Sequence, residues 1–354
     1  MKRAKNLYPH VWDFANLLLA AHKALRGKRR KSTPARFSLD LEKELCALED
    51  ELRGKTYTPG PYHEFEVLDP KRRLVSAAPF RDRVVHHALC NVIEPLFEPS
   101  FIFDSYACRK GKGTHAAADR ATRFARASKY VLQCDVSDYF ASIDHEILLG
   151  LLGRKIGCAD TLWLIERIIG SGGGRVSAPV YYPGDSLFAP YERRRGLPLG
   201  NQTSQFFANV YLNRVDHIAK EELGLRRYIR YVDDMVMFGD EKEELWGALA
   251  GLEAGLSGLR LHLNPRKTRL QPVELGFSFM GYRIFPDHRR LKKENGFRFR
   301  RRLHRMAEEY RIGERAMEEI NPSVQSWIGH ASHADTWGLR RRIFGEVAFA
   351  SPRA

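Results

Sequence analysis

Two aspartates stand side by side between two apolar, β-prone runs, and this feature limits the folds open to the chain. In the stretch YIRYVDDMVMFGD, residues 228–240, Asp233 and Asp234 separate YIRY from MVMF. Aspartate favours turns, so an ordinary tight connection between two strands is one explanation. The Asn-Gly or Asp-Gly pair that hairpin turns prefer is absent, however. Carboxylates at the edge of a buried sheet need cations close by, so a metal site is the other explanation.

A third aspartate ends a second apolar run. Residues 130–135, YVLQCD, are apolar and β-prone as far as Asp135, which predicts a buried strand that terminates in an acid. If Asp135, Asp233 and Asp234 share one sheet, three carboxylates converge without His or Cys. Such an oxygen-only set suits Mg²⁺, with Mn²⁺ as a substitute, and the Val136 carbonyl could add a ligand. Two ions held there would activate an attacking hydroxyl and stabilise a leaving pyrophosphate.

The overall charge points to a polyanionic partner. The chain of 354 residues carries 58 Lys and Arg against 43 Asp and Glu, a net charge of +15, and its pI is near 9.7. Two basic clusters stand out, at residues 27–31 and at 289–305, where Phe297 and Phe299 are interleaved with the basic side chains. One cluster alone would indicate a solvated basic face, whereas two on so basic a chain favour nucleic acid.

Composition indicates a globular protein without a membrane partner. Hydrophobic residues make up 44% of the chain, which suits two or three packed units. No apolar run is long enough to span a membrane, and the N-terminus lacks the apolar core of a signal peptide. The expected location is therefore cytoplasmic. The five cysteines form no CxxC pair, which indicates free thiols rather than a zinc site.

Mixed helix and strand signals predict the α+β class. Residues 1–60 are expected to be mainly helical, with one helix capped by Ser38 and ended by Gly54. Further helices are expected at residues 81–97, 115–127, 203–223 and 242–259, and towards the C-terminal end. Strand pairs are expected within 62–79, with a turn at Asp69 and Pro70, and within 227–239 and 277–285. Residues 171–195 predict a Gly/Pro-rich loop.

The order of these segments resembles that of a known family, the reverse transcriptases of bacterial and phage retroelements. The segments that resemble its palm motifs are, in order, QCDVSDYFASIDH (133–145), GLPLGNQTSQFFANVYLN (196–213), YVDD (231–234), LHLNPRKT (261–268) and FSFMGY (277–282). Upstream, PKRRLVSAAPFRDRVVHHAL (70–89) and SYACRKGKGTHAA (105–117) resemble the fingers motifs. The resemblance covers about residues 60 to 285 and implies an RNA-directed DNA polymerase, a nucleotidyltransferase.

The resemblance also implies a domain organisation. A right-hand polymerase fold of the α+β class has fingers, a palm whose antiparallel sheet packs on helices, and a helical thumb. The corresponding parts here would be a basic helical extension at 1–60, fingers at 61–129, a palm at 130–275 that includes the inserted loop 171–195, and a primer grip with a helical basic thumb at 276–354.

The segment 199–205 indicates a subtype. Most relatives carry QGxxxSP there, whereas this chain has Leu199 in place of Gln and Gln205 in place of Pro. This LGNxTSQ form, with the ending SWIGHASHADTW (326–337), resembles the reverse transcriptases of diversity-generating retroelements. Those enzymes copy a template RNA with frequent errors at adenines, and the cDNA replaces a variable region of a target gene. The implied partners are template RNA, nascent cDNA, dNTPs and a pentameric accessory variability protein.

Three residues near the nucleotide invite a physical interpretation. A Gln near the nascent pair can hydrogen-bond the incoming nucleotide and Leu199 cannot, so one polar check on pairing is lost. Phe140, five residues past Asp135, could lie under the sugar and exclude a 2′-hydroxyl, or be an ordinary core residue. Gly200 would let the chain approach the template and primer closely.

The resemblance assigns roles to further residues. Lys267 would protonate the leaving pyrophosphate, with an ordinary surface lysine as the alternative. The residues expected to bind the nucleotide are Lys71, Arg73, Phe140, Leu199, Gly200 and Gln205. Those expected to contact primer or template are Arg81, Tyr231, Phe279, Gly281 and Tyr282. Asp138 and Asp144 are expected to be surface or helix-capping residues.

Other functions remain open for this set of motifs. The enzyme could belong to a retron, an abortive-infection system or an intron, although the chain has no VTG triplet of the retron kind and no long segment after the thumb. A non-catalytic RNA-binding scaffold is the alternative outside enzymes, and the intact Asp135, Asp233 and Asp234 argue against it. An RNA-dependent RNA polymerase shares the palm, and comparing dNTP with NTP incorporation separates the two.

Overall fold

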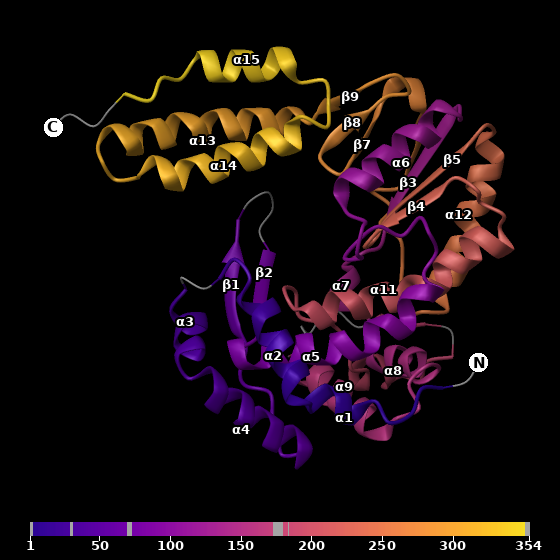
Figure 1. Cartoon of the computed structure of the whole chain (residues 1–354). Coiled ribbons are helices and arrows are strands. Elements are labelled where there is room, and N and C mark those ends of the chain that lie inside the picture. The colour runs from indigo at the N-terminus through magenta and orange to yellow at the C-terminus, as the bar shows by residue number, and fades with distance from the viewer. Residues whose placement is uncertain (1–2, 29–30, 69–72, 173–179, 183, 351–354) are drawn as a thin grey trace.

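The protein is an α+β chain in which helices surround three antiparallel sheets. The computed structural model in Figure 1 describes residues 3–28, 31–68, 73–172, 180–182 and 184–350. Within these residues the sheets have two, four and three strands. The mixed class and the antiparallel pairing confirm what the sequence predicts.

Helices build the N-terminal part of the chain, as expected. They are α1 (Tyr8–Trp12), α2 (Phe14–Leu25), α3 (Ser32–Leu39) and α4 (Leu41–Arg53). Gly54 follows the end of α4, and its N–H donates to the Asp50 carbonyl. The expected cap at Ser38 is wrong, because Ser38 lies inside α3 and its hydroxyl donates to the Pro34 carbonyl 3.0 Å away. A short polar residue can satisfy its hydroxyl on the preceding turn of a helix, so it does not by itself mark a helix start.

A hairpin and two helices come next in the chain. Strands β1 (His63–Val67) and β2 (Arg73–Ala77) pair in antiparallel register. They are followed by α5 (Phe80–Phe97), the short 3-10 helix η1 (Glu98–Ser100) and α6 (Thr114–Arg126). α5 packs against α2, so the hairpin is attached to the N-terminal helices. The expected turn at Asp69 and Pro70 lies outside the described residues.

The four-stranded sheet is the centre of the molecule. Its strands are β3 (Tyr130–Asp135), β4 (Tyr228–Tyr231), β5 (Asp234–Gly239) and β6 (Arg269–Pro272), in the order β4-β5-β3-β6. β3 therefore pairs with strands from two distant segments of the chain. Its partner β5 runs antiparallel along its whole length, from Tyr130 opposite Gly239 to Asp135 opposite Asp234. This register brings the two acid-ended strands together.

Each face of the central sheet has its own hydrophobic core. Successive strand residues point to opposite faces, so Leu132 and its partner Met237 belong to one core while Val131 and Phe238 belong to the other. The helices between the strands contribute mainly to the first core. They are α7 (Tyr139–Ser142), α8 (His145–Gly153), α9 (Ala159–Ser171), α10 (Ala189–Glu192), α11 (Gln202–His217), the π-helix η2 (Ile218–Glu222) and α12 (Lys242–Ser257).

The C-terminal part combines a small sheet with long helices. Its elements are the 3-10 helix η3 (Val273–Leu275), β7 (Phe277–Phe279), β8 (Tyr282–Ile284), β9 (Arg289–Leu291), α13 (Lys293–Arg311), α14 (Met317–Ala331) and α15 (Trp337–Gly345). In Figure 1 these last three helices lie along the top, the N-terminal helices at the lower left and the central sheet at the right. The apolar side chains of β7–β9 and of α13–α15 join the second core. In the described part of the chain, no helix has the length and apolarity needed to cross a membrane.

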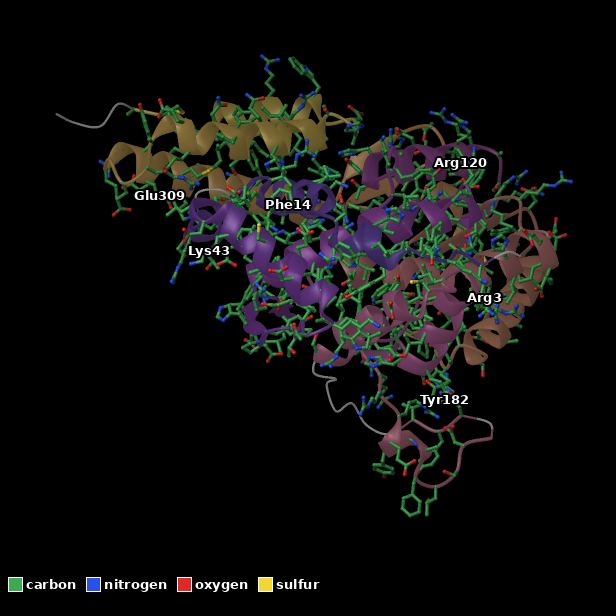
Figure 2. The ribbon with its side chains drawn as sticks, turned by 60° about the horizontal axis from the view of Figure 1, so that its bottom comes forward. Arg3, Phe14, Lys43, Arg120, Tyr182 and Glu309 are labelled. Atoms are coloured by element: carbon green, nitrogen blue, oxygen red, sulfur yellow. The ribbon has the colours of Figure 1, made fainter. Side chains whose placement is uncertain are left out.

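The described residues of the Gly/Pro-rich segment, 180–182 and 184–195, project from the body, and Figure 2 shows Tyr182 among them. Tyr182 anchors the projection, because its ring stacks on His262 at 5.0 Å and its hydroxyl donates to the Arg260 carbonyl at 2.6 Å. Arg193 adds an ion pair with Asp144 at 3.4 Å. Asp144 also caps α8 by accepting from two backbone N–H groups, which confirms its expected structural role.

Candidate active site

The ends of β3 and β5 bring two carboxylates into one pocket. Asp135 and Asp234 are partners in the antiparallel register, and their side chains form a hydrogen bond with each other. They line a cavity of about 220 Å³ together with Lys267. The pairing rests on a contact between segments almost one hundred residues apart in the sequence, so it depends on the sheet topology rather than on local structure.

The protonation of Asp234 reflects this crowding of negative charge. Burial, the charges of Asp233 and Asp135 and the hydrogen bond with Asp135 raise the pKa of Asp234 to about 7. Two carboxyl groups that are hydrogen-bonded to each other in a partly buried site do not readily ionise at the same time. Asp234 therefore keeps its proton below about pH 7 when no cation is bound.

Lys267 supplies the positive charge that the pocket does have. Its Nζ donates to Asp135 Oδ2 at 2.6 Å. Burial opposes the charged form of this lysine, but the hydrogen bond and the charge of Asp135 outweigh it and raise the pKa of Lys267. The segment that carries Lys267 is fixed to β3, because the Asn264 N–H donates to the Asp135 carbonyl at 2.7 Å. Lys267 thus lies beside Asp135, and its role as a proton donor stays a prediction.

The expected convergence of three carboxylates is only partly met by the side chains as they lie. Among the residues that the structure describes, no group of three or more His, Cys, Asp or Glu side chains is arranged to hold a metal ion. Asp135 accepts from Lys267 Nζ at 2.6 Å and is hydrogen-bonded to Asp234. Asp233 contributes its charge to the pocket, and Val136 is buried directly after β3.

The donor set nevertheless fits a hard divalent cation. Asp135 and Asp234 offer carboxylate oxygens, which are the ligands that Mg²⁺ and Mn²⁺ prefer. Burial and the neighbouring charges of Asp233 and Asp135 raise the pKa of Asp234, and Lys267 offsets this only in part. A cation would remove that penalty, so the chemistry of the site favours one.

This arrangement predicts how stability depends on pH and on Mg²⁺. Above about pH 4 the unfolded chain has lost the Asp234 proton, while the folded protein keeps it up to about pH 7. At Asp234 the folded state binds more protons in this window, so the contribution of Asp234 to the free energy of unfolding should fall as pH rises from 4 to 7 and then level off. Histidines such as His86 and His87, whose pKa values are lowered by burial, contribute with the opposite sign. Stabilisation by Mg²⁺ should grow over the same range, because the ion competes with the proton.

Melting temperatures between pH 5 and pH 8, with EDTA and with excess Mg²⁺, measure both effects. Asp234→Asn removes this titrating group, so its melting temperature in EDTA should lack the fall with pH that Asp234 contributes in the wild type. Equal slopes for the wild type and this variant would contradict the assignment of the proton to Asp234.

The turn between β4 and β5 is held by a buried arginine that the sequence argument missed. Arg230 is fully buried, and its guanidinium donates to both carboxylate oxygens of Asp216, at 2.7 and 2.6 Å. It also donates to Asn209 at 3.2 Å and to the Val232 carbonyl at 3.0 Å. Val232 has φ +56°, which is costly for a β-branched residue. Arg230 thus stabilises a strained turn beside Asp233.

A signal for Arg230 was present in the sequence. Arg230 is a charged residue within the β-prone run YIRY. A charge inside such a run is unusual, and when it is buried it needs a partner of opposite charge. Its partner Asp216 lies on α11 and could not be identified without the fold.

The LGNxTSQ segment lies against the β1–β2 hairpin and the loop before α6. Gly200 has φ +113°, and a Cβ atom there would lie 3.2 Å from Val75 of β2. The close approach expected at Gly200 is therefore to the protein's own hairpin. The Gln205 amide oxygen accepts from the Cys108 thiol at 3.0 Å, and Leu199 is half-buried. Their contacts with a nucleotide remain predictions.

The expected residues of the hairpin and of α5 are only partly described. Lys71 lies outside the described residues, and Arg73 begins β2. Arg81 forms ion pairs with Glu51 at 2.6 Å and Glu44 at 3.8 Å, both on α4. The structure thus gives Arg81 a role in joining α5 to α4, which the sequence argument did not foresee.

Other expected contact residues lie deeper than anticipated. Phe140 packs against the first core and Tyr231 against the second. Phe279 and Tyr282 are buried, with 4% and 0% of their surface exposed, because β7 and β8 turn these side chains into the second core. Neither ring offers a free surface to a primer. Gly281, at the turn between them, has φ +86°, and a contact of this hairpin with a primer would have to use its backbone.

Comparison with known proteins identifies the family. Residues 68–284 match the model of the family described as reverse transcriptase (RNA-dependent DNA polymerase). The chain is 26% identical over 288 residues to protein YkfC of Escherichia coli, covering 68% of this chain and 71% of YkfC. It is 25% identical over 178 residues to the group II intron-encoded protein LtrA of Lactococcus lactis, covering 49% of this chain and 28% of LtrA.

The family match spans more than half of the chain and contains the paired aspartates, the YVDD turn and Lys267. The chain therefore belongs to the reverse transcriptase family. It is an RNA-directed DNA polymerase.

Proposed function

We propose that the chain copies a template RNA into error-prone cDNA for a diversity-generating retroelement, with Asp135, Asp233 and Asp234 at the reaction centre. The observation that carries the polymerase site is the register that sets Asp135 opposite Asp234 beside Lys267. Three acids and a lysine are a suitable set for a reaction in which negative charge develops on phosphate oxygens. The substrates would be dNTPs and an RNA template with its nascent cDNA.

The domain organisation is part of the same proposal. The β1–β2 hairpin, α5 and α6 would be the fingers (61–129), the central sheet and its helices the palm (130–275), and β7–β9 with α13–α15 the primer grip and thumb (276–354). Support comes from the family match over residues 68–284 and from the positions of the β1–β2 hairpin and of α13–α15 in Figure 1, which lie apart from the central sheet. α6 is the exception, because it packs against β4 and β8.

The metal ions belong at the paired strand ends. Asp135, Asp233, Asp234 and the Val136 carbonyl would hold Mg²⁺ or Mn²⁺. When bound, such ions supply Lewis-acid stabilisation of the attacking and leaving oxygens. Asp135 and Asp234 would orient the reacting groups by their place in the sheet, and Lys267 would deliver a proton to the pyrophosphate from Nζ. The raised pKa of Lys267 keeps this proton in place at neutral pH.

The subtype rests on residues 199–205. Leu199 replaces the Gln of most relatives, and it directly precedes Gly200, where a Cβ atom would lie 3.2 Å from Val75 of β2. An apolar side chain there cannot test an incoming nucleotide through a hydrogen bond. The proposed low fidelity follows from this loss, and the pentameric accessory variability protein is the proposed protein partner.

Leu199→Gln should lower misincorporation opposite template adenine. One restored hydrogen bond is worth about 0.5–1.5 kcal/mol, or roughly threefold to tenfold in discrimination. Sequencing of cDNA from one defined RNA template measures the effect. Leu187→Gln, the same change at an exposed position of the projecting segment, is the matched control and should leave the error rate as it is. Equal error rates for Leu199→Gln and the wild type would rule out this role for Leu199.

Primer extension on an RNA template with Mg²⁺ and dNTPs tests the proposed function itself. The template RNA of the element and its accessory protein are added in parallel reactions. DNA product from the wild type, absent with Asp233→Ala and mutated mainly at template adenines, is the expected result. Tight RNA binding without product in any reaction would favour a scaffold instead.

An intron-type reverse transcriptase is the second candidate. It is favoured by the similarity to LtrA, which is described as a group II intron-encoded protein. The similarity covers 49% of this chain but only 28% of LtrA, so it extends to a minor part of that protein. DNA product with ordinary fidelity at adenines in the same assay would support this candidate over the first.

A further inference from the structure

The segment SWIGHASHADTW packs around the hydroxyl of a single buried tyrosine. This segment contains the end of α14 and the loop before α15. The Tyr282 oxygen, on β8, lies 2.8 Å from the His330 carbonyl, 3.0 Å from His330 Nδ1 and 3.0 Å from His115 Nδ1. His115 belongs to α6. One oxygen atom thus joins α14, the β7–β8 hairpin and α6.

The protons of this contact can be assigned from the partners. A carbonyl only accepts, so the Tyr282 hydroxyl must donate its proton to the His330 carbonyl. Its oxygen can then accept from Nδ1–H of both His115 and His330. Burial lowers the pKa of each histidine, and burial raises the pKa of Tyr282 to about 12. All three groups are therefore neutral at pH 7, and the tyrosine oxygen makes three hydrogen bonds.

Packing around the hydroxyl closes the contact on other sides. His333 stacks on His115 with ring centroids 3.8 Å apart, and His330 stacks on Tyr282 at 4.7 Å. A Cβ atom at Gly281 would lie 3.1 Å from His330 Nε2, so the glycine lets the imidazole reach the hairpin. The Asp335 N–H donates to a backbone carbonyl of β9 at 2.8 Å. These contacts define a joint, formed by Tyr282, His115, His330 and His333.

The joint adjoins a basic hollow on the described surface. A cavity of about 700 Å³ lies between α13 and α14. The residues that line it are Asn295, Arg298, Phe299, Arg301, Arg302, Arg305, Ser326, Trp327 and His330. His330 belongs to both the cavity and the joint. Four arginines beside stacked aromatic rings suit the phosphates of a nucleic acid strand. The contacts of His330 with Tyr282 therefore also fix the position of these arginines relative to the β7–β8 hairpin.

We infer that Tyr282, His115 and His330 are positioning residues that hold α13 and α14 at a fixed angle to the β7–β8 hairpin during repeated nucleotide addition. This inference rests on the proposed polymerase function. None of these three residues lines the pocket of Asp135, Asp234 and Lys267, although Ser278 of the neighbouring strand β7 does. Their effect should therefore appear in how long the enzyme stays on its template and not in the rate of a single insertion.

Tyr282→Phe removes the shared oxygen and keeps the ring. Each hydrogen bond lost is worth about threefold to tenfold in an equilibrium, so the mean product length in one binding event, measured with a heparin trap, should fall by about that factor. The rate of first nucleotide insertion should stay within about twofold of the wild type, as expected when the reacting groups are untouched. Tyr310→Phe, a tyrosine of α13 in contact with Phe349, is the matched control and should keep the wild-type product length.

A second pair of variants separates positioning from general loss of structure. His330→Ala should shorten the products as Tyr282→Phe does. His330→Asn places an amide N–H near the position of Nδ1–H and should restore most of the length. Wild-type product length in Tyr282→Phe, or equal defects in His330→Ala and His330→Asn, would overturn the inference. An insertion rate that falls in proportion to product length would overturn it as well.

Hydrogen exchange tests the joint without any catalysis. In Tyr282→Phe, backbone amides of residues 277–291 and 326–336 should exchange faster, while those of β3 and β5 keep wild-type rates. Unchanged exchange in the first two segments would refute the joint. If the wild type inserts no nucleotide on any template, the polymerase proposal fails by itself, and the exchange result still decides whether the joint exists.

Discussion

Asp135→Asn should abolish DNA synthesis and leave the protein folded. The carboxylate of Asp135 faces Asp234 across the strand pair and accepts from Lys267 Nζ at 2.6 Å. Replacing one oxygen by an amide removes its negative charge and thereby its affinity for a divalent cation. Loss of several kcal/mol of transition-state stabilisation corresponds to a rate of single-nucleotide insertion lower by roughly 10³-fold or more.

The control for this variant lies three residues along the chain. Asp138 is exposed and has φ +41°, a conformation that asparagine tolerates as well as aspartate does. Asp138→Asn should therefore insert nucleotides at the wild-type rate. Both variants should melt close to the wild-type temperature, since an asparagine at 135 can still hydrogen-bond Asp234. Substantial synthesis by Asp135→Asn would show that the reaction centre lies elsewhere.

Asp216→Ala should cost most of the stability of the protein. It would leave the guanidinium of Arg230 buried without its carboxylate, and breaking a buried ion pair in this way costs about 3–5 kcal/mol in free energy of unfolding. Both side chains are 0% exposed. Marginally stable domains have only about 5–15 kcal/mol in total, so the melting temperature should drop sharply. Denaturant unfolding followed by circular dichroism measures the change.

Two comparisons make this expectation specific. Lys55→Ala breaks an ion pair with Asp160 in which both side chains are about half exposed, and it should cost only about 0–1 kcal/mol. Replacing both partners, as Arg230→Met with Asp216→Leu, removes the stranded charge and should be less destabilising than Asp216→Ala alone. If Asp216→Ala and Lys55→Ala cost the same, the Arg230 network is not what stabilises the YVDD turn.

The two strands that end in aspartates could be predicted from the sequence because each has a local pattern of apolar, β-prone residues. Apolar, β-prone residues lead into Asp135 and flank Asp233 and Asp234, and Lys267 follows from the order of motifs. The register between the strands is a different matter. It arises because β3 is central and pairs with both β5 and β6, a choice that depends on how the whole sheet is buried.

Residues whose roles depend on distant partners could not be placed from the sequence. Arg230 forms an ion pair with Asp216 on α11, and Arg81 forms one with Glu51 on α4. The resemblance of FSFMGY to a family motif assigned Tyr282 to the primer or template, yet its hydroxyl finds partners inside the protein. In each case a polar group that the sequence leaves unassigned is satisfied by tertiary structure.

The second hydrophobic core bears on how the chain can be divided for expression. The family match stops at residue 284, which invites truncation there. Phe277 and Phe279 before that point share their core with Phe299 and Trp327 beyond it. A fragment that ends at 284 would keep α6 on this face of the sheet but would lose Phe299, Leu303, Met306 and Trp327 from the core, and it should be recovered mainly in inclusion bodies. The polymerase region is therefore not a portable module, and expression boundaries belong beyond α15.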